Sequence, residues 1–113
     1  MKKNIPNEFL KCSDKKLIEL LKCRKGGKTT MEIMDLILQQ PLNKNQIAKM
    51  IKKDYHTIRY HLQIMCQNKY IVQEEIGKRY YYWPSKKLIK NIDTYNKIKD
   101  SFKKEKEEND YEK

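Results

Sequence analysis

The segment 54–68 carries the side chains best suited to binding an anionic partner. Ile58, Leu62 and Met65 recur with the spacing of one helical face, so the segment is predicted to be a helix with one buried side. The opposite side presents groups that can bond phosphates and base edges: Tyr55, His56, Arg59, Tyr60 and Gln63. An arginine can pair with the acceptor edge of guanine, a glutamine can pair with adenine, and a tyrosine can bond a phosphate oxygen. The pattern therefore predicts a helix that recognises DNA.

Two further polar groups flank this helix in the sequence. Lys44, Asn45 and Gln46 begin another predicted helix, where unpaired backbone N–H groups and the helix dipole favour a phosphate. Lys78 and Arg79 lie at the tip of a predicted hairpin. The candidate DNA-binding residues are Lys44, Asn45, Gln46, Tyr55, His56, Thr57, Arg59, Tyr60, Gln63, Lys78 and Arg79.

Five helices and one hairpin are predicted to position these residues. The helices cover about 14–25, 31–40, 44–53, 55–69 and 86–102, and the strands cover about 70–76 and 79–83. Pro41 is expected to end the helix over 31–40. Leu42 is expected to form a single-residue apolar bridge to the helix over 44–53. The expected helix caps are Ser13, Thr29 or Thr30, Asn43, Asp54 and Ser85.

This order of elements predicts a mainly α fold with a small β-hairpin (α+β), a winged helix-turn-helix with flanking helices at both ends. Residues 1–28 are expected to form a basic helix or arm, residues 29–85 the DNA-binding domain, and residues 86–113 a C-terminal dimerisation helix with a frayed end. The recognition helix, about 54–68, would enter the major groove. The wing, about 76–80, would contact the adjacent backbone or minor groove.

The charge of the chain supports an anionic partner. Its 113 residues include 26 Lys and Arg against 15 Asp and Glu, a formal net charge of +11. Nine cations and three anions lie in residues 1–28, and six cations and one anion lie in residues 43–70. Nucleic acid is the first candidate partner and an acidic membrane surface the second. Genome composition or adaptation to high temperature is an alternative origin of the many lysines.

Several other classes of function are not expected. The sequence has no carboxylate pair, triad-like set or glycine-rich phosphate loop, so an enzyme is not predicted. Cys12, Cys23 and Cys66 form neither a metal-binding motif nor an even disulfide set, so no metal or other cofactor is expected. No apolar run approaches ~18 residues, and no signal segment is visible. We therefore expect a cytoplasmic protein without a membrane partner.

Short motifs in the region of about 30–85 carry a family resemblance. Gln46-Ile47-Ala48 and Thr57-Ile58-Arg59-Tyr60-His61-Leu62 are followed by Ile71-Val72, by the Gly77-Lys78 turn and by Tyr80-Tyr81-Tyr82. These motifs resemble those of the ArsR-type (arsenic-repressor-like) winged helices and their archaeal relatives. The resemblance implies a dimeric transcription regulator whose DNA contacts are carried by Tyr55, His56, Arg59, Tyr60 and Gln63. The family often has glycine in the turn where Lys52 and Lys53 stand, and at Lys69. The Cys-x-Cys pair of its metal-sensing members is absent.

Some features have two interpretations. His61 is expected to be half-buried and to bond the backbone or a phosphate, although it could contact bases. Cys66 is expected to be a buried, small apolar residue, with a redox sensor as the alternative. An apolar stripe either packs within the chain or forms a dimer seam, which we favour; it comprises Leu88, Ile92, Tyr95 and Phe102. The whole domain could instead be a winged-helix protein-interaction module within a larger assembly.

Overall fold

The computed structural model describes residues 14–111 of the chain, with side chains described for residues 14–104. The chain divides into two compact units. One unit comprises residues 29–90, and the other comprises the described residues of the two flanks, 14–28 and 91–111. The expected cap Ser13 and the thiol of Cys12 lie outside the described residues.

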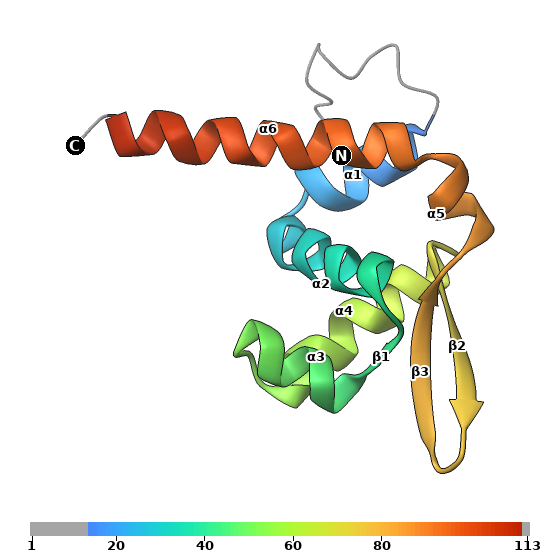
Figure 1. Cartoon of the computed structure of the whole chain (residues 1–113). Coiled ribbons are helices and arrows are strands. Elements are labelled where there is room, and N and C mark those ends of the chain that lie inside the picture. The colour runs from blue at the N-terminus through green and yellow to red at the C-terminus, as the bar shows by residue number, and fades with distance from the viewer. Residues whose placement is uncertain (1–13, 112–113) are drawn as a thin grey trace. The chain divides into compact units, whose positions relative to one another are not determined.

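The unit of residues 29–90 is a winged helix-turn-helix (Figure 1). Its helices are α2 (Gly27–Gln39), which begins just before the unit, α3 (Lys44–Ile51), α4 (Tyr55–Gln67) and α5 (Lys86–Lys90). Its strands are β1 (Leu42–Asn43), β2 (Ile71–Ile76) and β3 (Arg79–Pro84). The predicted fold class, mainly helical with a small sheet, is confirmed.

The sheet contains one strand more than expected. Its order is β1-β3-β2 with antiparallel pairing, and Leu42 pairs with Tyr82 while Asn43 pairs with Tyr81. The prediction that Leu42 is a single-residue bridge was therefore wrong, because Leu42 and Asn43 together form the short strand β1 at the edge of the sheet. Strand β1 runs directly into α3, so its pairing holds the start of α3 beside the wing.

The core of this unit is formed by the apolar positions that the helical periodicity predicts. Ile33, Met34 and Ile37 of α2, Ile47 of α3, and Ile58, Leu62 and Met65 of α4 are all at most 1% exposed. Tyr70, Ile71 and Tyr82 add a wall from the wing, with exposures of 0–2%. The buried aliphatic side of α4 fixes which of its faces remains accessible.

The C-terminal end of α4 is attached to the segment that follows the wing. The Ser85 hydroxyl donates to the Lys69 carbonyl oxygen at 2.7 Å, and Lys87 Nζ donates to the Asn68 carbonyl oxygen at 3.2 Å. The Ser85 hydroxyl also accepts from the Leu88 backbone N–H, which confirms the expected cap of the helix at 86. One serine therefore joins the end of α4 to the start of α5.

The start of α2 differs from the prediction. Thr29 or Thr30 was expected to cap this helix, but it begins at Gly27. A side chain at Gly27 would collide with the Leu21 carbonyl oxygen, so the close approach of the two backbone segments requires glycine there. Thr30 consequently lies within the helix, fully buried.

Two lysines adopt the left-handed backbone conformation. Lys52, at the end of α3, has φ 62°, and Lys69, before β2, has φ 65°. At both places the ArsR-type family, which the sequence resembles, often has glycine. Glycine adopts this backbone conformation without the clash that a Cβ causes. The chain therefore follows the backbone path of a glycine-containing turn with lysine in its place.

The second unit contains α1 (Lys15–Lys22) and α6 (Ile92–Tyr111), which pack against each other. Asp14 caps α1 by accepting from the Leu17 backbone N–H at 3.1 Å. Lys22 Nζ lies 4.4 Å from the centroid of the Phe102 ring of α6. Helix α6 therefore packs on α1 within its own chain, and the dimer seam expected for the stripe that includes Phe102 stays a prediction.

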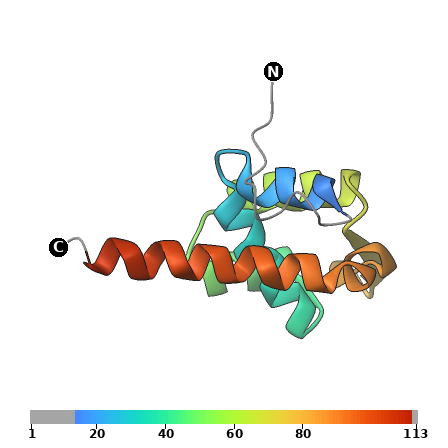
Figure 2. The ribbon, with the colours of Figure 1, turned by 90° about the horizontal axis from the view of Figure 1, so that it is seen from above.

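The C-terminal region differs from the single helix expected over 86–102. It is interrupted at Asn91, which separates α5 from α6. Fraying was expected from Lys103, but α6 continues to Tyr111 as one long helix (Figure 2). Lysine and glutamate, which dominate this stretch, are good helix formers. Within residues 14–111 no helix is long and apolar enough to span a membrane. Among the side chains described for residues 14–104, no cluster of metal-binding groups is found.

The left-handed conformation of Lys69 leads to a stability prediction. The free energy of unfolding of Lys69→Gly should exceed that of Lys69→Ala by about 1 kcal/mol, because only glycine removes the Cβ clash. Lys69→Gly should therefore unfold at a higher urea concentration. The pair Lys49→Gly and Lys49→Ala is the control, since exposed Lys49 lies within α3, where alanine should be the more stable by about 1 kcal/mol. Urea denaturation followed by circular dichroism measures both pairs. The same order of stability at both positions would contradict the assignment of strain to Lys69.

Candidate nucleic-acid interface

The outer face of α4 presents the polar side chains that the periodicity placed there. Tyr55 is 43% exposed and Tyr60 is 57% exposed, and His56, Arg59 and Gln63 are also exposed. The aliphatic residues of the same helix are buried. The helix thus offers a continuous row of hydrogen-bonding groups to a partner, as sequence reasoning expected.

His61 does not belong to this outer face. It is 5% exposed, and its Nδ1 lies 2.8 Å from the Thr30 hydroxyl of α2. Half-burial with a bond to the backbone or a phosphate was expected, whereas the ring is buried and bonds a side chain. The contact joins α2 to α4 across the core, so His61 helps to orient the helix.

Caps begin the two helices of the helix-turn-helix, as predicted. Asn43 and Gln46 form a reciprocal capping box in which each side chain accepts from the other residue's backbone N–H, both at 2.9 Å. Asp54 accepts from the Thr57 backbone N–H at 2.8 Å and from its hydroxyl at 3.0 Å. These bonds hold the pKa of the Asp54 carboxyl below its ordinary value. Two candidate contacts, Gln46 and Thr57, therefore already bond within their own helix starts.

A small pocket joins three separate parts of the candidate site. It has a volume of about 170 Å³, and its walls come from the start of α3, the start of α4 and the tip of the wing. Lys44 and Asn45 meet Lys78 and Arg79 here, and Tyr55 also lines the pocket. Lys44 Nζ lies 5.8 Å from the centroid of the Tyr55 ring, which is within cation–π range. The strand pairing of β1 with β3 creates this arrangement, which sequence reasoning did not foresee.

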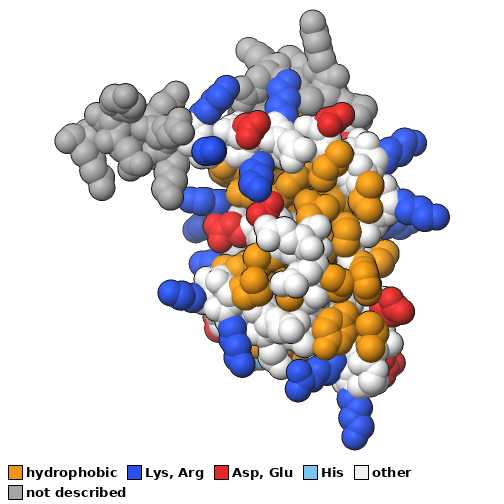
Figure 3. Space-filling view, in the orientation of Figure 1, with side chains coloured by type: hydrophobic (Ala, Val, Ile, Leu, Met, Phe, Trp, Pro, Cys, Tyr) orange, Lys and Arg blue, Asp and Glu red, His pale blue; other side chains and the backbone are white. Residues whose placement is uncertain are grey.

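Charge along the wing is divided between its tip and its sides. Lys78 and Arg79 lie at the tip, whereas Glu74 and Glu75 lie further up β2. Figure 3 shows basic side chains at the far end of the hairpin, acidic ones along its edge, and exposed apolar side chains between them. Only the tip is electrostatically suited to a phosphate.

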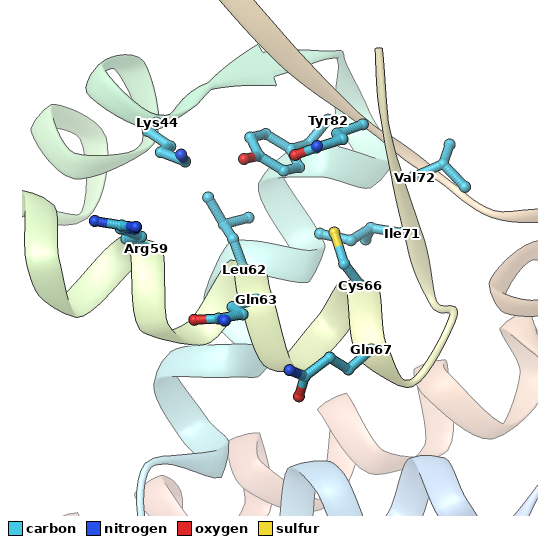
Figure 4. Close-up of a pocket in the computed structure, with 10 residues that line it drawn as sticks. Lys44, Arg59, Leu62, Gln63, Cys66, Gln67, Ile71, Val72 and Tyr82 are labelled. Atoms are coloured by element: carbon cyan, nitrogen blue, oxygen red, sulfur yellow. The ribbon is translucent and has the colours of Figure 1, made fainter.

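A larger concavity lies between α4 and the sheet, with a volume of about 570 Å³ (Figure 4). Arg59 and Gln63 of α4 and Lys44 of α3 contribute to its walls, so it shares residues with the candidate interface. No periodicity or motif could have located it, because it depends on the angle between a helix and a sheet.

Cys66 lies at this concavity and is half-buried. Burial raises the pKa of its thiol, and the positive charge of Lys44 opposes this effect. A raised pKa keeps the sulfur protonated at neutral pH, where the thiol reacts slowly. The observation favours the interpretation of Cys66 as a small packing residue over that of a redox sensor.

Comparisons with known proteins identify the fold. No family model and no curated protein matches the chain. Among solved structures, MepR, a transcription regulator of the Staphylococcus aureus multidrug efflux pump MepA, matches with a TM-score of 0.59 and 22% identity, over 80% of this chain and 67% of MepR. A MepR mutant bound to an oligodeoxyribonucleotide matches with a TM-score of 0.58 and 20% identity, over 79% of this chain and 67% of the mutant chain. At these identities the likeness concerns the fold, and it supports neither ArsR-type nor archaeal membership specifically.

The contact between α2 and α4 leads to a second prediction. Thr30→Val removes the hydroxyl that bonds His61 while keeping the shape of the side chain, and should lower the free energy of unfolding by about 1 kcal/mol. Thr29→Val is the matched control, because Thr29 is the more exposed neighbour in the same helix. Thermal and urea denaturation compare the two variants. Equal stabilities would show that the Thr30 bond does not stabilise the fold.

The lowered pKa of Asp54 leads to a pH prediction. The charged cap stabilises the fold above the ordinary pKa of aspartate, and this contribution is lost as the pH falls through the lowered pKa of the folded state. Asp54→Asn retains a capping side chain without the charge. The native chain should therefore be more stable than this variant at neutral pH, and the difference should shrink in acid. Urea denaturation over a range of pH tests this, and a difference independent of pH would contradict it.

Proposed function

We propose that the chain is a sequence-specific transcription regulator that binds double-stranded DNA as a homodimer. The observation that carries this proposal is the division of α4 into a buried aliphatic side and an exposed side with arginine, glutamine and tyrosine. A single helix of this kind fits the major groove of B-DNA. MepR, which has the same fold, is a transcription regulator, and one of its mutants is bound to an oligodeoxyribonucleotide.

Base recognition is assigned to the middle of α4. Arg59 and Gln63 lie one helical turn apart on its exposed side, where Arg59 can bond guanine and Gln63 can bond adenine. Tyr60 and His56 flank them and can contact phosphates or neighbouring bases. This assignment keeps four of the five contacts expected from the ArsR-type resemblance; the fifth, Tyr55, lines the small pocket. The family membership itself is part of the proposal.

Phosphate contacts are assigned to the small pocket at the wing tip. Lys44, Lys78 and Arg79 surround it, and the start of α3 contributes its backbone dipole. A phosphate held there would fix the wing against the backbone while α4 lies in the groove. Because each neutralised phosphate releases counterions, affinity should fall steeply as salt rises.

A homodimer would place two recognition helices in successive major grooves of a pseudo-palindromic site, about one helical turn apart. Two copies double the number of bases contacted, which a short recognition helix needs for specificity. We expect the regulator to act in the cytoplasm.

A protein-interaction module is the second candidate. It is favoured by the apolar residues on the wing, since Val72, Ile76 and Tyr80 are 47–49% exposed. A wing that binds protein would not require affinity for duplex DNA. The two functions therefore differ in a single binding measurement.

Selection of duplexes from a random pool, followed by fluorescence anisotropy, tests the main proposal. Arg59→Ala should weaken binding to the selected site by about 1–3 kcal/mol and relax the preference at one base position. Lys78→Ala should weaken binding to all sequences alike and reduce the slope of affinity against salt by about 1. Both effects follow from the assignment of Arg59 to a base and Lys78 to a phosphate.

Lys104→Ala, an exposed change in the other unit, is the control and should bind as the parent chain does. If Arg59→Ala and Lys78→Ala both bind the selected site as tightly as the parent chain, the assigned interface is wrong. If the parent chain has no affinity for any duplex at low salt, the interaction module is favoured. Stoichiometry of the bound complex tests the homodimer.

A further inference from the structure

Among the residues that the structure describes, one edge of strand β2 is covered by no other strand (Figure 1). β2 is the last strand in the sheet order β1-β3-β2 and pairs with β3 on its other side. Residues 72–76 are all exposed, and within the described part of the chain they form no backbone hydrogen bond outside this ladder. Alternate residues of an edge strand direct their backbone N–H and carbonyl groups outward. The edge can therefore accept a further strand.

The side chains along this edge combine apolar surface with negative charge. Val72, Glu74 and Ile76 lie on one face of β2, because successive side chains of a strand alternate. Val72 and Ile76 are each 49% exposed. Glu74 and Glu75 are the only acidic residues in the segment 55–92, although the chain has a net charge of +11. A strand that fits this edge therefore needs two apolar side chains with positive charge between them.

The same charges argue against two other occupants. Glu74 and Glu75 repel phosphates, so this edge differs in function from the basic tip at Lys78 and Arg79. The β2 edge of a second copy would bring like charges together, which destabilises a strand pair. An extended basic segment of a different protein meets neither obstacle.

We propose that the free edge of β2 binds an extended segment of a partner protein in which the side chains follow the order apolar, basic, basic, polar, apolar. The segment adds as an antiparallel strand, the more stable of the two pairings. Its basic side chains lie opposite Glu75 and Glu74, its apolar side chains opposite Ile76 and Val72, and its polar side chain opposite Gln73.

The wing would then have two partners, a duplex at its tip and a protein at its edge. A regulator bound to DNA could hold a second protein in this way without releasing the duplex. This simultaneous binding rests on the proposed function, whereas the binding of the segment to the β2 edge does not.

Fluorescence of the full chain with synthetic peptides tests the class of partner. Trp83, the single tryptophan of the sequence, pairs with Val72 and should report occupation of the edge. The peptide GSIKKQVSG should bind about three- to tenfold more tightly than GSIQQQVSG, because only the first forms two opposite-charge pairs across the strands. Absence of binding at millimolar concentration, or equal affinities of the two peptides, would overturn the proposal.

Two double variants with the same change in net charge locate the bound peptide. Glu74→Gln, Glu75→Gln should remove the preference for the lysine peptide, since its basic side chains lose their partners. Asp93→Asn, Asp100→Asn removes two exposed carboxylates from the other unit and should keep the preference. Equal effects of the two double variants would show that the net charge of the chain attracts the peptide, which contradicts a site at the edge.

Methylation of the peptide backbone tests for strand addition. Two versions of the lysine peptide carry N-methyl groups on alternate residues, in opposite phase. One version should fail to bind and the other should bind nearly as well as the unmodified peptide, because alternate N–H groups of an added strand face β2. A docked helix or loop has no such alternation, so equal affinities of the two versions would refute the proposal.

Sedimentation of the chain without peptide tests a second copy as the occupant. Glu74→Gln, Glu75→Gln should sediment as the native chain does. A change in oligomeric state would show that another copy of the chain occupies the edge, and the proposal of a different partner protein would fail.

Simultaneous binding is measured on the duplex selected from the random pool. The lysine peptide should bind the DNA-bound chain as tightly as the free chain. Release of the duplex by the peptide would refute the two-partner wing. The measurements on peptide and chain need no DNA, so they decide the edge site even if the chain has no affinity for duplex.

Discussion

The pairing of Asn43 with Tyr81 is the interaction on which the rest of the interface depends. Asn43 ends strand β1, pairs with the wing and caps α3 with its side chain. One residue thereby fixes the start of α3 to the sheet. Without this attachment Lys44 and Asn45 would not lie next to Lys78 and Arg79, which are distant in the sequence. The proposed phosphate site is thus a consequence of one short strand.

Features set by local rules could be predicted from the sequence. The buried and exposed sides of α4 follow from a repeat of Ile58, Leu62 and Met65, and the caps at Asn43 and Asp54 follow from their position before apolar periodic segments. Strand β1 could not be predicted, because two residues carry no periodicity and form a strand only where a partner already exists. The start of α2 depends on a contact of Gly27 with Leu21, which is also absent from any local pattern.

The apolar stripe of the C-terminal region shows a further limit of sequence patterns. Periodicity predicts that one face of a helix is buried, but it does not say what covers that face. Here α1 packs against α6 within the second unit, and Lys22 lies over the ring of Phe102. The large concavity beside α4 is similarly invisible in the sequence, since it arises between elements.

The attachments at both ends of α4 have a consequence for the kinetics of association. Asp54 and Thr57 order its first turn, and Ser85 and Lys87 hold the carbonyl groups just beyond its last turn. A helix restrained in this way loses little conformational entropy on docking. We therefore expect encounter with a partner to resemble the meeting of rigid bodies, with a rate set by diffusion and long-range attraction instead of by folding.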